Sequence, residues 1–539
     1  MTESPRPNVS RNLILFFGSN TTRTALLMVV GFILTPLQIA AFGLVLFGLF
    51  QLINQLSMAV TSPIRSAVIR TLVKAIFESK ASEGQRGVER QFTCCVAIVW
   101  SVAGLMVATA AICLIFLPNL MNFPDWATNA VRLAFGSQAI VFAAIMCTSP
   151  WLALYLVRHR PLAFNADLTV MRTIDLIAFL IAIGSSEGAS QVFGVFVVSR
   201  MGLVVLHCLT RLVLTWRQVP GARFRFRSLD RATIKRLAHV GSLTMGQPVG
   251  NISFFFLDNY LLNIIFGPIY NAIYGIVTQL RGYARRVGAQ GFAGMEATVA
   301  DMHEQGGHET NIRAMLAVSR ITSGVMMLST GIVAVFFGPL VDLWLGGRLR
   351  KDEALLAVMP YQEAIDLAWG MLALLLGGGI LLEVAGAGSR FLFGMGHIKR
   401  YAGIMYAAGL TKFLLSMSIL VGIFAWLGDA EPDPHVVLLF PAATLLVQLI
   451  YFGLVFPKRL IHLTGVPGRT YLWQSFGRPA AAAVLPLAIG GAMVLLIDAW
   501  TWPLLVVMLG VVGSVSAACF LGILMQPDER RRILSLIRR

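Results

Sequence analysis

The sequence predicts an all-α polytopic membrane protein with about fourteen transmembrane helices. Of its 539 residues, 57% are hydrophobic and only 13% are charged, whereas soluble proteins carry roughly 25% charged residues. The apolar residues form continuous runs, and a helix needs ~20 of them to cross ~30 Å of hydrocarbon. These runs do not alternate polar and apolar residues as the strands of an outer-membrane barrel do. Composition therefore excludes a secreted domain, a cytosolic enzyme with one anchor and a disordered chain.

Fourteen hydrophobic spans follow one another along the chain. The first comes directly after the polar, basic segment MTESPRPNVSR, and its apolar run is too long for the core of a signal peptide. We therefore expect an uncleaved first helix. The spans run roughly over residues 12–38, 44–72, 92–117, 128–156, 162–183, 189–214, 239–265, 269–293, 314–337, 364–391, 402–427, 436–456, 479–499 and 503–525.

Lys and Arg gather in the loops that follow the even-numbered spans, and the other loops are mostly acidic. One dissenting loop, 338–363, carries three basic residues together with four acidic ones. Because cytoplasmic loops are enriched in Lys and Arg, this alternation predicts that both termini are cytoplasmic. Most of the net charge of +17 is thereby assigned to topology, and nucleic-acid binding is not needed. The loop after the sixth span carries Arg217, Arg223, Arg225, Arg227, Arg231, Lys235 and Arg236.

Residues 17–56 and 240–280 resemble one another. Phe42-Gly43 matches Phe266-Gly267, and Gln55-Leu56 matches Gln279-Leu280. Because six spans precede the second copy, both copies start on the same side and form a parallel repeat with pseudo-twofold symmetry. We expect two six-helix lobes and a C-terminal helix pair. The predicted domains are an N-lobe (1–214), a basic cytoplasmic linker (215–238), a C-lobe (239–456) and a last helix pair with a basic tail (457–539).

The linker 215–238 has two interpretations. Its pattern RFRFRSLDRATIKRL suits an amphipathic helix on the inner membrane surface. A solvated positive loop fits equally well. The six cysteines lie inside apolar runs without the spacing of metal ligands, so they are expected to be core residues, and no metal site is predicted.

Several cations fall inside the predicted spans, where ionisable groups usually face a cavity or pair with one another. Arg23, Arg281 and Lys412 have no acidic residue within reach on their own helices. We therefore predict a water-filled, positively charged cavity between the lobes. Such a cavity suits an anion, and the planar donor fork of Arg suits phosphate. Arg65 and Arg285 complete the predicted site for an anionic head group.

Each of these cations also has a structural interpretation: a salt bridge to another helix, a snorkelling side chain or an anchor at the inner membrane edge. Pairing is favoured for Arg172 and Arg200, because Asp175 and Asp167 are available.

Acids inside transporters often carry protons or Na⁺. Asp258, Asp366 and Glu383 are the candidates for ion coupling, and pairing with a nearby Arg is the alternative. The run Gly377–Gly379 suits a kink or, more commonly, close helix packing.

Motifs of other protein classes do not appear. The sequence has no Walker pattern, no HExxH and no GxSxG, and its loops are too short for a catalytic domain. An Arg ladder and a TVGYG filter are missing as well. We therefore expect neither an enzyme nor a channel, and no catalytic residues.

The segment FGLVLFGLFQLINQLSMAVTSPIRSAVIRTLVKA (Phe42–Ala75) resembles the polysaccharide transporter family of the multidrug/oligosaccharidyl-lipid/polysaccharide (MOP) flippase superfamily. The resemblance implies a V-shaped, alternating-access flippase in a bacterial inner membrane. Its cargo would be an undecaprenyl-diphosphate-linked oligosaccharide, such as an O-antigen, capsule or exopolysaccharide unit, with the diphosphate near Arg23, Arg281 and Lys412. It also implies a Na⁺ or H⁺ gradient without another cofactor, and a polysaccharide polymerase or glycosyltransferase complex as partner.

The sequence departs from this family in two places. The acid that is common near the end of the second helix is not evident in MAVTSPIRSAVIR. The Arg-rich first helix of the lipid II flippase branch is reduced to Arg23, which disfavours lipid II as cargo. A cation-coupled multidrug exporter is the alternative function, although a drug cation would need an acidic cavity. A scaffold without transport activity in an envelope-synthesis complex is a third.

Overall fold

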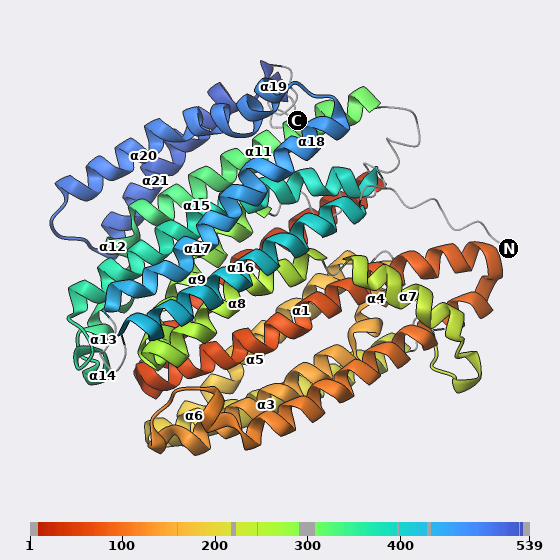
Figure 1. Ribbon diagram of the computed structural model, residues 1–539, viewed down its shortest axis with the longest axis horizontal. Coiled ribbons are helices and arrows are strands. Elements are labelled where there is room, and N and C mark those ends of the chain that lie inside the picture. The colour runs from red at the N-terminus through yellow and green to blue at the C-terminus, as the bar shows by residue number, and fades with distance from the viewer. Residues whose placement is uncertain are drawn as a thin grey trace. The chain divides into compact units, whose positions relative to one another are not determined.

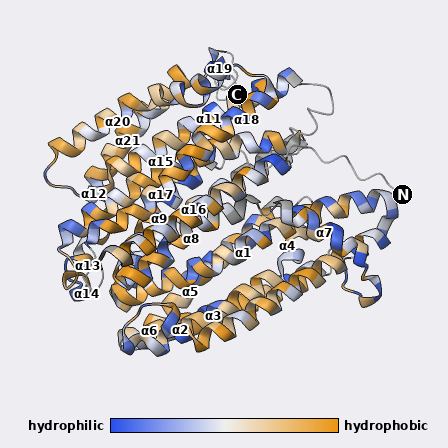
Figure 2. Cartoon of the chain, viewed as in Figure 1, coloured by the Kyte–Doolittle hydropathy of each residue, from blue (hydrophilic) through white to orange (hydrophobic). Residues whose placement is uncertain are grey.

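The computed structural model describes residues 9–158, 160–216, 222–244, 246–289, 308–395, 398–427, 433–527 and 529–531. Throughout these ranges the ordered elements are helices, with no strand (Figure 1). Within the described ranges, eleven helical segments are long and apolar enough to cross a membrane, and apolar residues predominate along them (Figure 2). The predicted fold class, an all-α polytopic membrane protein, is confirmed.

The first helix, α1 (Val9–Ile115), covers three predicted spans. Two glycines break it into the corresponding segments. Gly43 has φ +78° and Gly84 has φ +64°, and glycine adopts such left-handed angles without steric strain. The helix continues beyond the second predicted span, which ends near residue 72, to the turn at Gly84. The extension has an exposed polar face, with an ion pair between Lys74 and Glu78 at spacing i, i+4, while Ala75, Ile76 and Ser79 are buried.

The predicted repeat has a structural counterpart. Gly267, which matches Gly43, has φ +85° and separates α8 (Gly246–Phe266) from α9 (Pro268–Ala289). Both copies thus place a glycine turn between two consecutive helices. The aligned aromatic residues Phe50 and Tyr274 are both buried. The two copies share a local backbone geometry as well as a sequence pattern.

Contacts divide the chain into two compact units, Met1–Ala272 (unit 1) and Ile273–Arg539 (unit 2). The predicted lobe boundaries stay a prediction. Unit 1 contains α1 and α8, together with α3 (Thr128–Cys147), α4 (Ser149–Val157), α5 (Pro161–Ser185), α6 (Ala189–Trp216) and α7 (Arg231–Thr244). The short elements are α2 (Leu117–Leu120), η1 (Asp125–Ala127) and η2 (Phe226–Ser228).

Aromatic packing fixes the helices of unit 1 around the first glycine turn. Phe42 contacts the rings of Phe179, Phe193 and Phe196 on α5 and α6 at centroid distances of 5.3–5.7 Å. These rings belong to a core shared by α1, α3, α5 and α6. The described part of the predicted linker includes the start of α7, which packs against α1; residues 217–221 lie outside the described residues.

Unit 2 contains most of α9 and the remaining long helices. They are α11 (His308–Val335), α15 (Tyr361–Gly394), α16 (Ile398–Leu427), α17 (Leu439–Gln448), α18 (Phe456–Thr464), α20 (Arg478–Leu496) and α21 (Trp502–Cys519). The short elements are α12 (Phe337–Val341), η4 (Asp342–Gly346), α13 (Gly347–Leu349), α14 (Glu353–Leu356), η5 (Pro434–Leu438), η6 (Leu449–Val455), α19 (Gly468–Leu472), η7 (Trp473–Gly477) and η8 (Phe520–Leu524).

The last helices pack on α11 through small residues. A Cβ at Gly331 would lie 2.4 Å from Leu487 of α20, and one at Gly324 would lie 2.4 Å from Leu524 of η8. Small residues let helices approach closely where lipid offers no hydrophobic driving force. The predicted C-terminal helix pair is therefore an integral layer of unit 2.

Candidate functional site

A buried ion pair joins α5 and α6 in unit 1. Asp167 shares a face of α5 with the buried residues Ile174 and Ala178, and Arg211 shares a face of α6 with Val204 and Cys208. Residues at these spacings lie on one side of a helix, which turns both charges into the packed interface. From the helix ends, both charges lie about 8–9 Å along their helices. Because consecutive helices cross a membrane in opposite directions, the charges meet at one depth.

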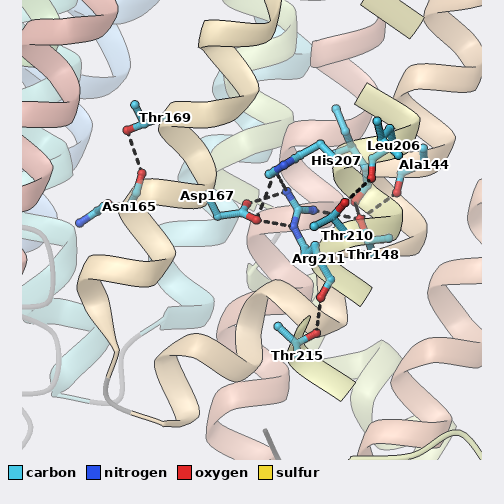
Figure 3. Close-up of polar contacts among 11 residues, drawn as sticks. Ala144, Thr148, Asn165, Asp167, Thr169, Leu206, His207, Thr210, Arg211 and Thr215 are labelled. Atoms are coloured by element: carbon cyan, nitrogen blue, oxygen red, sulfur yellow. Dashed lines mark hydrogen bonds and ion pairs between the residues drawn. The ribbon is translucent and has the colours of Figure 1, made fainter. Parts of the chain in front are cut away.

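Arg211 is fully engaged in this interface. Its Nε donates to Asp167 Oδ1 at 2.8 Å, and its Nη2 donates to Oδ2 at 2.6 Å (Figure 3). Its Nη1 donates to Thr148 Oγ1 at 2.9 Å. The side chain of Arg211 is 0% exposed and that of Asp167 is 6% exposed. The pair is bidentate, the strongest arrangement for Arg and a carboxylate.

Two of the predicted anion-binding residues lie beside this pair. Arg23 of α1 donates from Nη1 to Asn165 Oδ1 at 3.1 Å and from Nη2 to Asn20 Oδ1 at 2.6 Å. Arg65, also on α1, is half-buried and lies within electrostatic reach of Arg23, Arg211 and Asp167. Among the described residues, no hydrogen bond or salt bridge holds Arg65.

We call Arg23, Arg65, Asp167 and Arg211 the unit 1 cluster. Three cations and one carboxylate give it a formal charge of +2. Arg211 is balanced by Asp167, so Arg23 and Arg65 carry the excess.

A second ion pair in unit 1 follows the structural interpretation. Arg200 Nε donates to Asp175 Oδ1 at 2.7 Å, and Arg172 lies 3.6 Å from the other carboxylate oxygen. Arg200 also donates to Gln138 Oε1 at 2.5 Å. Pairing with Asp175 is confirmed, whereas Asp167 pairs with Arg211 instead. Sequence reasoning missed Arg211 and its neighbour His207, although both fall inside the predicted sixth span.

Unit 2 brings together two residues that were predicted for different roles. Arg285 of α9, a candidate for anion binding, forms an ion pair with Glu383 of α15, a candidate for ion coupling. Arg281, one turn earlier on α9, is buried and lies against Gly379, where a Cβ would be 3.6 Å from its Nε. A side chain at Gly379 would thus be in ordinary van der Waals contact with this guanidinium. The adjacent Gly378 makes room for Gln448 of α17.

The remaining predicted residues lie apart from these pairs. Lys412 of α16 is 0% exposed, and its Nζ donates to Ser416 Oγ at 2.7 Å and to the Phe440 carbonyl at 3.1 Å. Asp366 is exposed in the second turn of α15 and accepts a hydrogen bond from Gln362 at 3.1 Å. Asp258 of α8 is fully buried. Its ion-coupling role, those of Asp366 and Glu383, and the cavity between the lobes stay predictions.

Unit 2 contains one more buried cation that sequence reasoning missed. Arg320 of α11 donates from Nη2 to both oxygens of Glu529 at 2.6 and 2.7 Å and from Nη1 to Gln474 at 2.8 Å. Glu529 lies 209 residues further along the chain, so no local signal in the sequence connects the two. Over the described ranges, no cluster of three or more His, Cys, Asp or Glu side chains could hold a metal ion.

Comparisons with known proteins connect this architecture to transporters. No protein family model matches the sequence. The uncharacterized membrane protein EpsK of Bacillus subtilis (strain 168) is 19% identical over 522 residues, which cover 96% of each chain. Among solved structures, the lipid II flippase MurJ in an inward closed conformation matches with a TM-score of 0.65 and 10% identity, over 94% of this chain and 98% of that one. The chain has the fold of this solved structure.

The MATE transporters share this fold over less of the chain. A mutant of VcmN from Vibrio cholerae matches with a TM-score of 0.55 and 11% identity, over 84% of this chain and 98% of that one. The flippase structure therefore accounts for a larger part of this chain than the MATE structure does. At these identities the similarity shows the fold alone.

Proposed function

We propose that this protein is a flippase that moves a lipid-diphosphate-linked oligosaccharide across a bacterial inner membrane by alternating access. Both termini would lie in the cytoplasm, and the cargo would be an O-antigen, capsule or exopolysaccharide unit. Support comes from the MOP-type fold and from the greater coverage by the lipid II flippase structure. As a transporter it would have no catalytic residues.

The observation that carries this proposal is the cation excess of the unit 1 cluster. Asp167 balances Arg211, but no partner among the described residues neutralises Arg65. A guanidinium inside a membrane protein is stable when it faces water or binds an anion. A diphosphate offers several oxygen acceptors, which suit the donor forks of Arg23 and Arg65.

In this mechanism, Arg65 and Arg23 would hold the diphosphate while the sugar crosses inside the protein. Arg211 and Asp167 would keep α5 and α6 in place beneath it. The energy source would be a Na⁺ or H⁺ gradient. A polysaccharide polymerase or a glycosyltransferase complex would be the partner on the biosynthetic route.

Transport in liposomes tests the proposal directly. The purified protein is reconstituted with a fluorescent polyprenyl-diphosphate oligosaccharide, and a sugar-binding lectin reports the head groups that reach the other leaflet. We expect Arg65→Ala and Arg23→Ala to slow transfer at least about tenfold, because a hydrogen bond to a charged group contributes about 1.5–3 kcal/mol. Arg70→Ala is the matched control, since Arg70 lies on the same helix and is exposed. Wild-type rates in both cluster variants would refute the site.

The fold similarity to MATE transporters favours a multidrug exporter as the second candidate. An acidic cavity would suit a drug cation, whereas the unit 1 cluster is net basic. The same liposomes discriminate the two functions when an ion gradient is imposed and a cationic dye replaces the lipid. Dye transport without lipid transfer would favour the exporter. Unlabelled lipid II as a competitor tests whether the peptidoglycan precursor shares the site.

A further inference from the structure

We infer that His207 and Asp167 form a proton-binding site linked to the anion-binding residues of unit 1. His207 lies on α6, one turn before Arg211, and no role has been assigned to it so far. Figure 3 shows its ring beside the Asp167–Arg211 pair. The linkage to an anion rests on the proposed function, but the proton site itself does not.

The hydrogen bond that His207 Nε2 makes depends on whether this nitrogen carries a proton. His207 Nε2 lies 3.3 Å from Asp167 Oδ1 and 3.3 Å from Arg211 Nη2. The first neighbour is an acceptor and the second is a donor. With a lone pair on Nε2, the ring accepts from Arg211; with a proton there, it donates to Asp167. A charged imidazolium would also repel Arg211, so the proton decides how firmly Arg211 holds the carboxylate.

His207 is the most accessible member of the site. Its side chain is 14% exposed, whereas Asp167 and Arg211 are almost completely enclosed. Histidine is the side chain whose ordinary titration falls between pH 5 and 8. A proton that reaches the ring therefore need not open the buried ion pair.

Asp167 of α5 faces His207, and further charged and titratable groups lie around the Asp167–Arg211 pair that His207 contacts. Arg65 of α1 is within electrostatic reach of both members of this pair. Arg211 and Cys208 come from α6 itself, and Tyr155 of α4 lies within electrostatic reach of the Asp167–Arg211 pair. Arg160, just before α5, lies near Tyr155.

A proton on His207 raises the formal charge of the unit 1 cluster and its neighbour from +2 to +3. It also competes with Arg211 for Asp167, which leaves more guanidinium donors available. Both effects favour an anion near Arg65 and Arg23. Because linkage is reciprocal, a bound diphosphate must increase the proton affinity of the site by the same factor.

Binding measurements at different pH values test this linkage. The probe is a short-chain prenyl-diphosphate-linked sugar, a diester whose phosphates stay ionised over this range. Titration calorimetry of the wild-type protein should show about tenfold tighter binding near pH 5.5 than near pH 8, within the usual range of coupling between sites. Two buffers with different ionisation enthalpies should reveal uptake of up to about one proton at intermediate pH.

His207→Gln keeps the Asp167–Arg211 pair and should bind the probe with an affinity that no longer depends on pH. His239→Gln, which changes an exposed histidine on α7, should behave as wild type. Unchanged pH dependence in His207→Gln would overturn the linkage.

Direct titration of the ring separates this inference from the proposed function. In wild-type protein with labelled histidine, the NMR signal that His207→Gln removes should change from that of a neutral to that of a protonated ring as pH falls. A signal that stays that of a neutral ring at every pH would overturn the proton site, whatever the probe does. If the signal titrates but the probe binds at no pH, the proton site stands and the proposed diphosphate cargo is wrong.

Discussion

Two ion pairs, one in each unit, hold their arginine in different ways. In unit 1, Arg211 forms a buried bidentate pair with Asp167, and Arg23 and Arg65 carry the remaining positive charge nearby. In unit 2, Arg285 pairs with Glu383 while its own side chain stays 38% exposed. The helices of both units are similarly apolar, but these ion pairs differ in their burial and in their balance of charge. Unit 1 combines a sealed structural pair with cations available to a ligand, whereas the Arg285–Glu383 pair has a partly exposed arginine and contains its own counter-charge.

The largest expected effect comes from removing one charge of each pair. Asp167→Asn leaves Arg211 uncompensated in a closed interface and should lower the free energy of unfolding by about 3–5 kcal/mol. Glu383→Gln should cost only about 1 kcal/mol or less, because Arg285 can turn towards water. Thermal unfolding of the purified protein in one detergent compares the two variants.

The double variant Asp167→Asn/Arg211→Met is the control for this comparison. Because it removes the stranded charge, it should recover much of the lost stability. Equal losses in Asp167→Asn and Glu383→Gln would show that the two pairs are equally enclosed, contrary to the distinction drawn between the units.

A smaller change in stability is expected from replacing a glycine that packs against a neighbouring residue. A Cβ at Gly48 in unit 1 would lie 2.2 Å from the Pro268 carbonyl oxygen and 2.9 Å from the Ala272 nitrogen, both backbone atoms. Gly48→Ala should therefore destabilise the protein by about 1–3 kcal/mol, as overpacking does. At Gly379 in unit 2 the nearest atom is Arg281 Nε at 3.6 Å, an ordinary contact. Gly379→Ala should be neutral or slightly stabilising, because alanine favours helix.

Unfolding midpoints of the two glycine variants, measured in the same detergent, check this difference. A greater loss in Gly379→Ala than in Gly48→Ala would mean that Arg281 needs more space than this packing gives it. The guanidinium would then have to move during function.

The fold class could be predicted from hydropathy alone, because crossing a bilayer imposes the length and composition of each span. The glycine turn at Gly43 could also be anticipated, since its counterpart Gly267 recurs in the second copy. Pairing was predictable where the partners stand one turn apart, as Arg172 and Asp175 do.

The remaining pairs could not be predicted, because a helix that is apolar on all sides does not reveal which face points inward. Arg211 and Asp167 are 44 residues apart, and Arg285 and Glu383 are 98 residues apart. Arg285 was predicted to bind an anion and Glu383 to couple an ion, with pairing to a nearby Arg as the alternative for Glu383. Only the rotation and packing of their helices decides that they neutralise each other.

The smallest expected effect concerns a capping residue in unit 1 outside the membrane spans. Asp230 precedes α7 and accepts hydrogen bonds from the Thr233 side chain at 2.5 Å and from the Thr233 amide at 2.9 Å. These bonds favour the ionised carboxylate and lower the pKa of Asp230 below its usual value. The cap therefore stabilises α7 above the usual range of a carboxyl group, and this contribution is lost as pH falls through the lowered pKa.

Asp230→Ala should increase hydrogen exchange in the first turn of α7 at neutral pH, and the difference from wild type should shrink in acid. Asp352 is the counterpart in unit 2, but it caps only the four-residue helix α14 through Leu355. Asp352→Ala should therefore change exchange over a shorter stretch, since few backbone bonds depend on that cap. Equal protection of α7 with and without Asp230 would show that packing against α1 alone determines its stability, and the difference between the units would then be confined to the membrane spans.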